Sequence, residues 1–400
     1  MKLEIWRTLL TLTIVCCMLC SGCIEGGDNG ETVPPTSTEA PTTAMPTTTT
    51  PAPTESPNTL KLVDAWTLAI EAEPEFPLVL LQDSICVTTD EYIMLVSREG
   101  DVLWDKQLTG DIEIAPILYE ESVYLVYADG SVERRDDATG EVLWKKSVDA
   151  YPAVPVCAYG ERLYVASDSY LLCLMIETGD TIWSTELPGG TVYSCIVPYG
   201  DQLLLDTYAH NVTVVDVGTG AILDEWDARC DMVDIFVHDD SAYAMGGGCL
   251  TCLDADTGTT HWEYIFPGGG SWVPAFVDYP YAFITTIDDQ VLCVSIESGE
   301  FLWSDDAMYR AGLAISDEVL ISGIAYIPDM YKTGQGSWDP SSTPPMPTVT
   351  DGNLVAWNVS TGERILSMPA DQGLKWPVAI EERFVFVTGT SLACYMVEYK

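Results

Sequence analysis

Two cysteines with CxxC spacing are the residues of this chain that most resemble a metal or redox site. They are Cys249 and Cys252, in the stretch CLTC. Such a pair can supply half of a tetrahedral zinc site or form a redox-active disulfide. No second CxxC pair follows and no histidine adjoins this one. The sequence therefore favours a structural role over a zinc or redox centre.

The register of the cysteines supports that structural role. Four of them share one position, six residues before a recurring turn glycine or at the matching place of the last repeat: Cys173, Cys252, Cys293 and Cys394. Val214 and Ala356 fill the same place in other copies. Cysteine packs well as a small apolar residue, so the sequence predicts thiols that face a core.

Other residues suited to catalysis are few. The histidines His210, His238 and His261 show no HxxxH spacing, and no G-x-S-x-G nucleophile elbow is found. The stretch DADTG, 254–258, resembles the start of an EF-hand loop, but its glycine is fifth rather than sixth and no glutamate follows at the twelfth place. The sequence therefore predicts no catalytic residue, no metal ion and no cofactor.

DADTG is instead one copy of a turn that recurs along the chain. Related copies include DDATGEVLW at 136–144 and IESGEFLW at 296–303. The turn glycines are Gly100, Gly140, Gly179, Gly220, Gly258, Gly299 and Gly362. Their separations are 40, 39, 41, 38, 41 and 63 residues. A period near 40, with short Val-, Ile-, Leu- and Tyr-rich runs, is typical of a β-propeller with four-stranded blades.

The turn has a local reason to recur without any chemistry. Glycine suits a positive φ, and Asp and Thr bond the nearby backbone. One repeat predicts strands at 155–159, 162–166, 170–176 and 181–187, with the turn between the last two. A tryptophan four residues after the glycine is predicted to pack between blades and to donate its indole N–H to the neighbour's backbone. The five copies are Trp104, Trp144, Trp183, Trp262 and Trp303, whereas Asp224 and Leu366 stand at this place in two other copies.

Seven turns do not account for the two ends of the repeat region. The stretch 375–400 supplies three further strands, and the stretch 61–71 supplies one strand with a tryptophan. Joining them forms an eighth blade and removes the open edges of an unclosed ring. The sequence predicts an all-β, eight-bladed propeller of four-stranded antiparallel blades, whose last blade is closed by the N-terminal strand.

These repeats resemble the PQQ-like propeller repeat, found in quinoprotein dehydrogenases and in a lipoprotein subunit of the bacterial outer-membrane assembly machine. The resemblance rests on the TGxxxW turn and the eight blades, and it covers residues 60–400. For the enzyme members it implies a quinone beside a vicinal Cys–Cys disulfide and a Ca²⁺. Here the adjacent pair is Cys16–Cys17, in the N-terminal signal, and the enzymes' long insertions are missing. The resemblance thus implies the non-catalytic branch.

The N-terminal region predicts export and membrane attachment. Residues 1–22 combine a short charged start with an apolar run, as in a signal peptide. CSGC, 20–23, resembles a lipobox, which makes Cys23 the predicted lipid-attachment residue; an uncleaved signal anchor is the alternative. Residues 23–58 form a Thr- and Pro-rich linker. The propeller is predicted over 59–400.

Charge excludes one class of partner. The chain has 17 Lys and Arg against 61 Asp and Glu, a net charge of −44. Nucleic-acid binding depends on Lys and Arg, so this class is set aside. Cationic partners, metal ions or a salty habitat fit the charge, and dispersed carboxylates also maintain solubility.

Two kinds of covalent modification remain open. Asn211 begins the sequon Asn-Val-Thr and is the predicted glycosylation site of an exported protein. A second sequon begins at Asn358, which takes the aspartate place of the repeat turn. Disulfides among Cys86, Cys157, Cys195 and Cys230 cannot be assigned from the sequence.

The step of 63 residues locates the predicted partner face. The extra chain, 327–352, is Pro-rich and joins a second strand to a third, on the face opposite the TG turns. Loops between successive blades share that face. Aromatic and Arg side chains commonly anchor interfaces, so six are predicted to contact a partner: Trp272, Tyr309, Arg310, Tyr331, Trp338 and Trp376.

These observations favour a lipid-anchored, extracytoplasmic, monomeric propeller that binds a membrane or cell-surface protein without catalysis. Two alternatives remain open. One is an oxidoreductase, quinone-dependent or otherwise, with a site in the central channel. The other is a module that binds cell-surface carbohydrate through exposed Trp and Tyr.

Overall fold

The computed structural model describes residues 60–399, apart from short gaps and one long gap at 324–351. The predicted signal peptide, Cys23 and the linker lie outside the described residues. All regular structure in the described part is β-strand. No helix there is long and apolar enough to cross a membrane.

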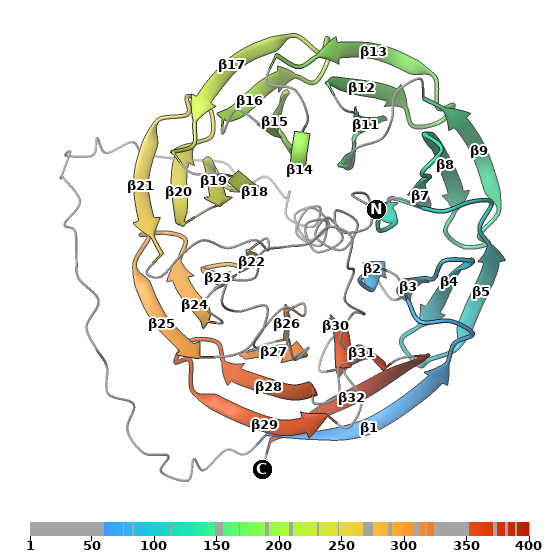
Figure 1. Ribbon diagram of the computed structural model, residues 1–400, viewed down its shortest axis with the longest axis vertical. Coiled ribbons are helices and arrows are strands. Elements are labelled where there is room, and N and C mark those ends of the chain that lie inside the picture. The colour runs from blue at the N-terminus through green and yellow to red at the C-terminus, as the bar shows by residue number, and fades with distance from the viewer. Residues whose placement is uncertain are drawn as a thin grey trace, which may run out of the picture.

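Eight four-stranded antiparallel sheets form a ring of blades around a central axis (Figure 1). Blades 1 to 4 contain β2 (Val79–Leu81), β3 (Ser84–Thr88), β4 (Tyr92–Ser97), β5 (Val102–Gln107); β6 (Ile117–Tyr119), β7 (Ser122–Val126), β8 (Ser131–Asp136), β9 (Val142–Ser147); β10 (Val156–Tyr159), β11 (Arg162–Ser167), β12 (Tyr170–Met175), β13 (Thr181–Glu186); β14 (Val192–Tyr199), β15 (Gln202–Thr207), β16 (Asn211–Asp216) and β17 (Ile222–Asp227). Blades 5 to 8 contain β18 (Met232–His238), β19 (Ser241–Gly246), β20 (Cys249–Asp254), β21 (Thr260–Ile265); β22 (Phe276–Asp278), β23 (Tyr281–Thr285), β24 (Gln290–Ser295), β25 (Phe301–Asp306); β26 (Leu313–Ser316), β27 (Val319–Gly323), β28 (Gly352–Asn358), β29 (Arg364–Ala370); β30 (Leu374–Ile380), β31 (Arg383–Thr388), β32 (Ser391–Tyr399) and β1 (Leu60–Ala69). The predicted eight-bladed propeller is confirmed.

Blade 8 is assembled from both ends of the described chain. Its strand order is β1-β32-β31-β30, and β1 lies beside β32 at the rim (Figure 1). The pairing runs from Leu60 opposite Tyr399 to Ala69 opposite Ser391. The predicted closure by the N-terminal strand is therefore confirmed. The closure pairs the outer edge of β32 and gives blade 8 four strands, as in the other blades.

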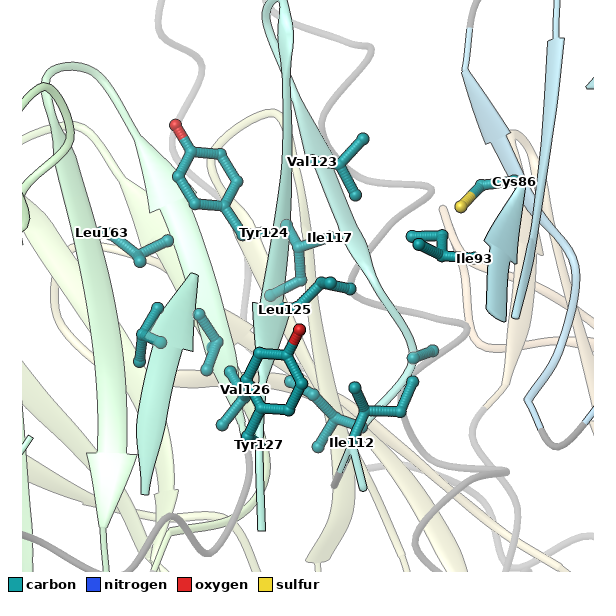
Figure 2. Close-up of a cluster of buried hydrophobic side chains, with 14 of the residues drawn as sticks. Cys86, Ile93, Ile112, Ile117, Val123, Tyr124, Leu125, Val126, Tyr127 and Leu163 are labelled. Atoms are coloured by element: carbon teal, nitrogen blue, oxygen red, sulfur yellow. The ribbon is translucent and has the colours of Figure 1, made fainter. Parts of the chain in front are cut away.

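The core lies between neighbouring blades, because each strand presents alternate side chains to the sheets on its two sides. Figure 2 shows this alternation on β7: Tyr124 points toward Leu163 of blade 3, and Val123 points toward Cys86 and Ile93 of blade 1. All five side chains are almost completely buried. Every blade thus covers the next, as a short repeat requires.

The TG turns and the tryptophans join each blade to the next. Trp104 donates its indole N–H to the Asp137 carbonyl at 2.6 Å, and its ring covers Gly140 of the next blade. Gly140 has a φ of +70°, and a Cβ there would lie 2.7 Å from the Trp104 ring. The turn therefore requires glycine for its backbone and for the space that the ring occupies. Trp144 repeats the arrangement with a 2.8 Å bond to the Ile176 carbonyl.

Blade 4 reaches the same contact from a different position. Asp224 stands at the tryptophan place, but Trp226, two residues later, is buried and lies on Gly258 of blade 5. Its indole N–H donates to the Asp224 carboxylate at 3.2 Å instead of to a neighbour's carbonyl. The contact between blades 4 and 5 is thus kept although the sequence register is shifted.

The tryptophan of blade 8 and the absence of one at the equivalent place of blade 7 both follow from the closure of the ring. Trp66 on β1 donates to the Arg98 carbonyl at 2.7 Å and covers Gly100 of blade 1. Leu366 lies on the outer strand of blade 7, which faces blade 8. The outer strands of blade 8 come from opposite ends of the described chain, so no TG turn joins them. A tryptophan at Leu366 would have no turn glycine to cover.

Candidate protein-binding faces

The CxxC cysteines lie on opposite faces of one strand. Cys249 and Cys252 are both on β20, and residues three apart in a strand point to opposite sides. Cys252 pairs with Tyr243 on one neighbouring strand and with Trp262 on the other. The two thiols therefore do not converge on one metal ion. Within the described part of the chain, no three His, Cys, Asp or Glu side chains are grouped so that they could hold one.

The third-strand cysteines are spacers between aromatic rings. Cys173 lies in register between Tyr164 and Trp183, whose ring centroids are 5.8 Å apart. Cys293 lies in the same way between Phe283 and Trp303, with 5.9 Å between the centroids. A thiol makes favourable contacts with aromatic rings.

Burial keeps these thiols unreactive. Desolvation raises the pKa of Cys173 to about 11 and that of Cys293 to about 12. The thiolate, which is the nucleophile and the metal ligand, is therefore scarce near neutral pH. No disulfide joins two of the described cysteines, which include Cys86, Cys157 and Cys195, and Cys230 lies outside the described residues.

The two described histidines contact different side chains. The His238 ring stacks on Tyr279 with 4.2 Å between centroids, and Tyr279 donates its hydroxyl hydrogen to Glu297. His261 Nε2 lies 3.9 Å from the Asp254 carboxylate. His210 lies outside the described residues.

The two sequon asparagines have different surroundings. Asn211 is half-buried at the start of β16, and its backbone carbonyl accepts a hydrogen bond from Thr207 at 3.2 Å. Asn358 acts as the aspartate of its turn: its side-chain oxygen accepts from the Thr361 N–H and hydroxyl, each at 3.0 Å. Asp254 accepts the same two bonds from Thr257. Glycosylation of Asn211 stays a prediction.

The strand order fixes where the predicted partner segments emerge. The chain reverses at each strand, so second-to-third connections and blade-to-blade connections leave the same face of the ring, opposite the TG turns. The long insertion connects β27 to β28 of blade 7. Five of the predicted contact residues lie outside the described residues: Trp272, Tyr309, Arg310, Tyr331 and Trp338.

The sixth residue, Trp376, was grouped with the loops between blades, and this placement was wrong. Trp376 and Lys375 belong to β30, the innermost strand of blade 8. The strand begins early because Leu374 and Lys375 already pair with β31. The register then shifts before Val378, and Pro377 falls in this irregular segment, where a missing N–H costs no ladder bond. Contact of Trp376 with a partner stays a prediction.

The comparisons with known proteins agree with this architecture. The model of the family described as Outer membrane protein assembly factor BamB matches residues 64–158, 152–263 and 246–395. The chain belongs to this family. The matched segments together extend from β1 to β32, so they include all eight blades.

Individual relatives in the family are distant. The Outer membrane protein assembly factor BamB of Burkholderia pseudomallei is 24% identical over 234 residues, which cover 54% of this chain and 61% of that protein. The protein of the same name from Bordetella pertussis is 22% identical over 276 residues, 64% of this chain and 67% of that protein. The aligned chain thus spans 61% and 67% of the length of these relatives.

Solved structures show the same fold in proteins of different function. BamB from Moraxella catarrhalis has a TM-score of 0.63 and 16% identity, and the match covers 84% of this chain and 98% of that one. Quinohemoprotein alcohol dehydrogenase from Comamonas testosteroni has a TM-score of 0.63 and 12% identity, covering 84% and 76%. At such identities the likeness shows the fold alone.

The described residues do not fit a quinone site of the kind that the resemblance implies. No two described cysteines adjoin in the sequence. Cys173 and Cys293 sit singly between aromatic rings of their own blades. The described part also lacks a grouped set of metal ligands for the accompanying Ca²⁺. We assign no described residue a role toward a quinone.

Proposed function

We propose that the protein is a membrane-anchored, extracytoplasmic propeller that binds other proteins as a non-catalytic assembly scaffold. The observation that carries this proposal is the family match over residues 64–395, because the relatives are named as outer membrane protein assembly factors. A closed ring of eight mutually covering blades also supplies broad, rigid faces on which partners can be held.

Attachment through Cys23 is the part of this proposal that fractionation can test. We expect the parent protein to enter the detergent phase of a membrane extract, whereas Cys23→Ser should shift it to the aqueous phase after signal cleavage. The physical reason is that the lipid supplies the buried apolar chain that holds the protein to the bilayer. A Cys23→Ser protein that stays in the detergent phase with its signal attached would show that a helix is the anchor.

The partner face is proposed on the side of the long insertion. Replacing residues 328–350 by a short Gly-Ser linker should leave the thermal midpoint nearly unchanged, since long surface loops cost little free energy to alter. The same replacement should abolish the recovery of partner proteins in a cross-linking pull-down from native membranes. The six predicted contact residues include Tyr331 and Trp338 in the replaced segment.

A matched control uses the opposite face. Leu302→Ser changes a side chain that is 40% exposed beside the TG turn of blade 6, and it should recover the same proteins as the parent. If a well-folded protein without residues 328–350 still captured its partner, the assignment of this face would be wrong.

An oxidoreductase is the second candidate function, because the Comamonas testosteroni dehydrogenase shares the fold with a TM-score of 0.63. Absorbance spectroscopy on protein purified from its native membrane separates the two. A stoichiometric quinone band would favour the enzyme, and co-purification of membrane proteins without such a band would favour the scaffold.

A further inference from the structure

Each blade has a β-bulge at the same place on its outermost strand. In blade 1, Leu95 pairs with Trp104 and Val96 pairs with Val102, so Leu103 has no opposite residue. The pairing of the other seven blades shifts at the matching position. The bulged residues are Ala65, Leu103, Leu143, Ile182, Leu223, His261, Leu302 and Ile365.

On four consecutive blades the bulge presents exposed aliphatic side chains. Leu103 is 54% exposed, Leu143 51%, Ile182 40% and Leu223 52%. The strand-starting residues Val102, Val142 and Ile222 are exposed as well. We name these seven residues the aliphatic arc. They lie on β5, β9, β13 and β17, which follow one another around the rim (Figure 1).

The fold itself does not require aliphatic residues at these positions. Blade 5 carries Thr260 and His261 at the two equivalent places, and blade 8 carries Asp64 and Ala65. Both blades keep the same bulge. Scattered exposed hydrophobics are normal on a protein surface, but exposed aliphatic residues repeated at one place on four consecutive blades are not scattered and indicate an interaction site. The aliphatic arc is thus best explained by a partner that covers it.

The bulge also indicates how a partner would bind. The outermost strand of each blade is an edge strand, and a bulge disrupts the regular ladder that an added strand would need. The side chains of the extra residues Leu103, Leu143 and Leu223 are about half exposed. A partner is therefore expected to contact the side chains of the arc rather than extend the sheet.

Charge around the arc selects the chemistry of that partner. The turns and outer strands of blades 1 to 4, residues 98–107, 136–147, 176–186 and 216–227, hold 13 Asp and Glu against 4 Lys and Arg. Lys106 and Lys146 are already paired, with Glu141 at 2.6 Å and Asp180 at 3.0 Å. The last two segments contain no Lys or Arg. A cationic surface is complementary to this one, whereas anionic lipid or a second copy of a chain with net charge −44 is repelled.

We propose that the aliphatic arc is a docking surface for a protein whose contact face has aliphatic side chains flanked by Lys and Arg. The arc adjoins the TG turns, at the opposite end of the blades from the long insertion. The inference extends the proposed scaffold function, because a scaffold with two working faces can hold two proteins at once. The inference rests on the exposure of the arc residues and on the charge of the surrounding segments. Neither depends on the insertion.

The test uses a defined probe, an 18-residue synthetic amphipathic helix with leucines on one face and lysines on the other, fluorescently labelled. We expect fluorescence anisotropy to show saturable binding to the full chain that weakens as salt is raised, since surface charges are screened. The variant Leu103→Ser, Leu143→Ser, Ile182→Ser, Leu223→Ser should bind at least tenfold more weakly. The matched Leu-and-Glu helix should not bind.

A control variant places the same change at the same bulge outside the arc. Leu302→Ser, at the bulge of blade 6, should bind the Leu-and-Lys helix within twofold of the parent. Both variants should keep the parent's thermal midpoint, since Leu103, Leu143 and Leu223 are about half exposed and surface changes rarely alter stability. The protein without residues 328–350 should also bind normally, which separates this test from the test of the insertion face.

Several outcomes would overturn the proposal. Equal probe binding by the four-serine variant would show that the arc is not the contact surface. Equal binding of the Leu-and-Glu helix would remove the charge argument. A dimer in sedimentation velocity, or flotation with phosphatidylglycerol vesicles, that the four serines abolish would assign the arc to a second copy or to a membrane instead.

Discussion

Removal of β1 should open the ring and destabilise the whole propeller. A variant that lacks residues 60–70 loses the β1 partners of β32, from Tyr399 to Ser391, and exposes an unpaired edge of that strand. It also loses Trp66 from Gly100 of blade 1. We expect a loss comparable to the total stability of a domain, about 5–15 kcal/mol. Thermal unfolding followed by circular dichroism measures it.

A second deletion provides the control for this experiment. Removing residues 31–58, which contain no aromatic residue, should leave the unfolding midpoint at the parent value. The two deletions differ in that only the first removes a strand of blade 8. An unchanged midpoint without residues 60–70 would contradict the shared blade.

The repeat period made most of the fold predictable from the sequence. Strands predicted at 155–159, 162–166, 170–176 and 181–187 are observed as Val156–Tyr159, Arg162–Ser167, Tyr170–Met175 and Thr181–Glu186. This accuracy has a local cause. The glycine of the turn and the alternating apolar residues of the strands are fixed by backbone conformation and by burial, and both can be recognised within one repeat.

Contacts between repeats were harder to predict. The sequence showed that Asp224 replaces a tryptophan, but not that Trp226 reaches Gly258 from two residues further along. Tyr119 accepts the Gly160 N–H at 2.8 Å, and Tyr159 donates to the Gly200 carbonyl at 3.3 Å. These bonds join a strand end of one blade to the first turn of the next. The repeat of tyrosine and glycine every 40 residues is visible in the sequence. Which blade each tyrosine contacts depends on how the blades are arranged in the ring.

The candidate binding surfaces were also predictable only where they depend on features within one repeat. Trp376 was grouped with a loop between blades, but the pairing of Leu374 with Thr388 begins β30 two residues before it. The aliphatic arc escaped prediction because Leu103 and Leu143 resemble ordinary strand residues in an alternating pattern. Their exposure and the bulge at which they lie depend on the pairing of the third and fourth strands.

Trp303→Ala should cause the largest loss of stability among single substitutions at the tryptophan place. Trp303 is 7% exposed, its ring lies on Gly362, and its indole N–H donates to the Val359 carbonyl at 2.8 Å. Truncation leaves a cavity between blades 6 and 7 and removes one buried hydrogen bond. We expect a loss of about 3–5 kcal/mol in the free energy of unfolding, measured by urea denaturation.

Leu366→Ala is the matched comparison, because it changes the same repeat position on the next blade. Leu366 is only half-buried, and blade 8 offers no TG turn for it to cover. Its truncation should cost roughly 1 kcal/mol, the ordinary effect of a substitution away from such contacts. Similar losses in the two variants would show that general burial on the outer strand, rather than the contact between ring and glycine, holds neighbouring blades together. A clear difference would mean that the contact between an indole ring and a turn glycine, made at seven of the junctions between blades, stabilises those junctions. Blade 8 would then be closed by a separate means, the pairing of β1 with β32.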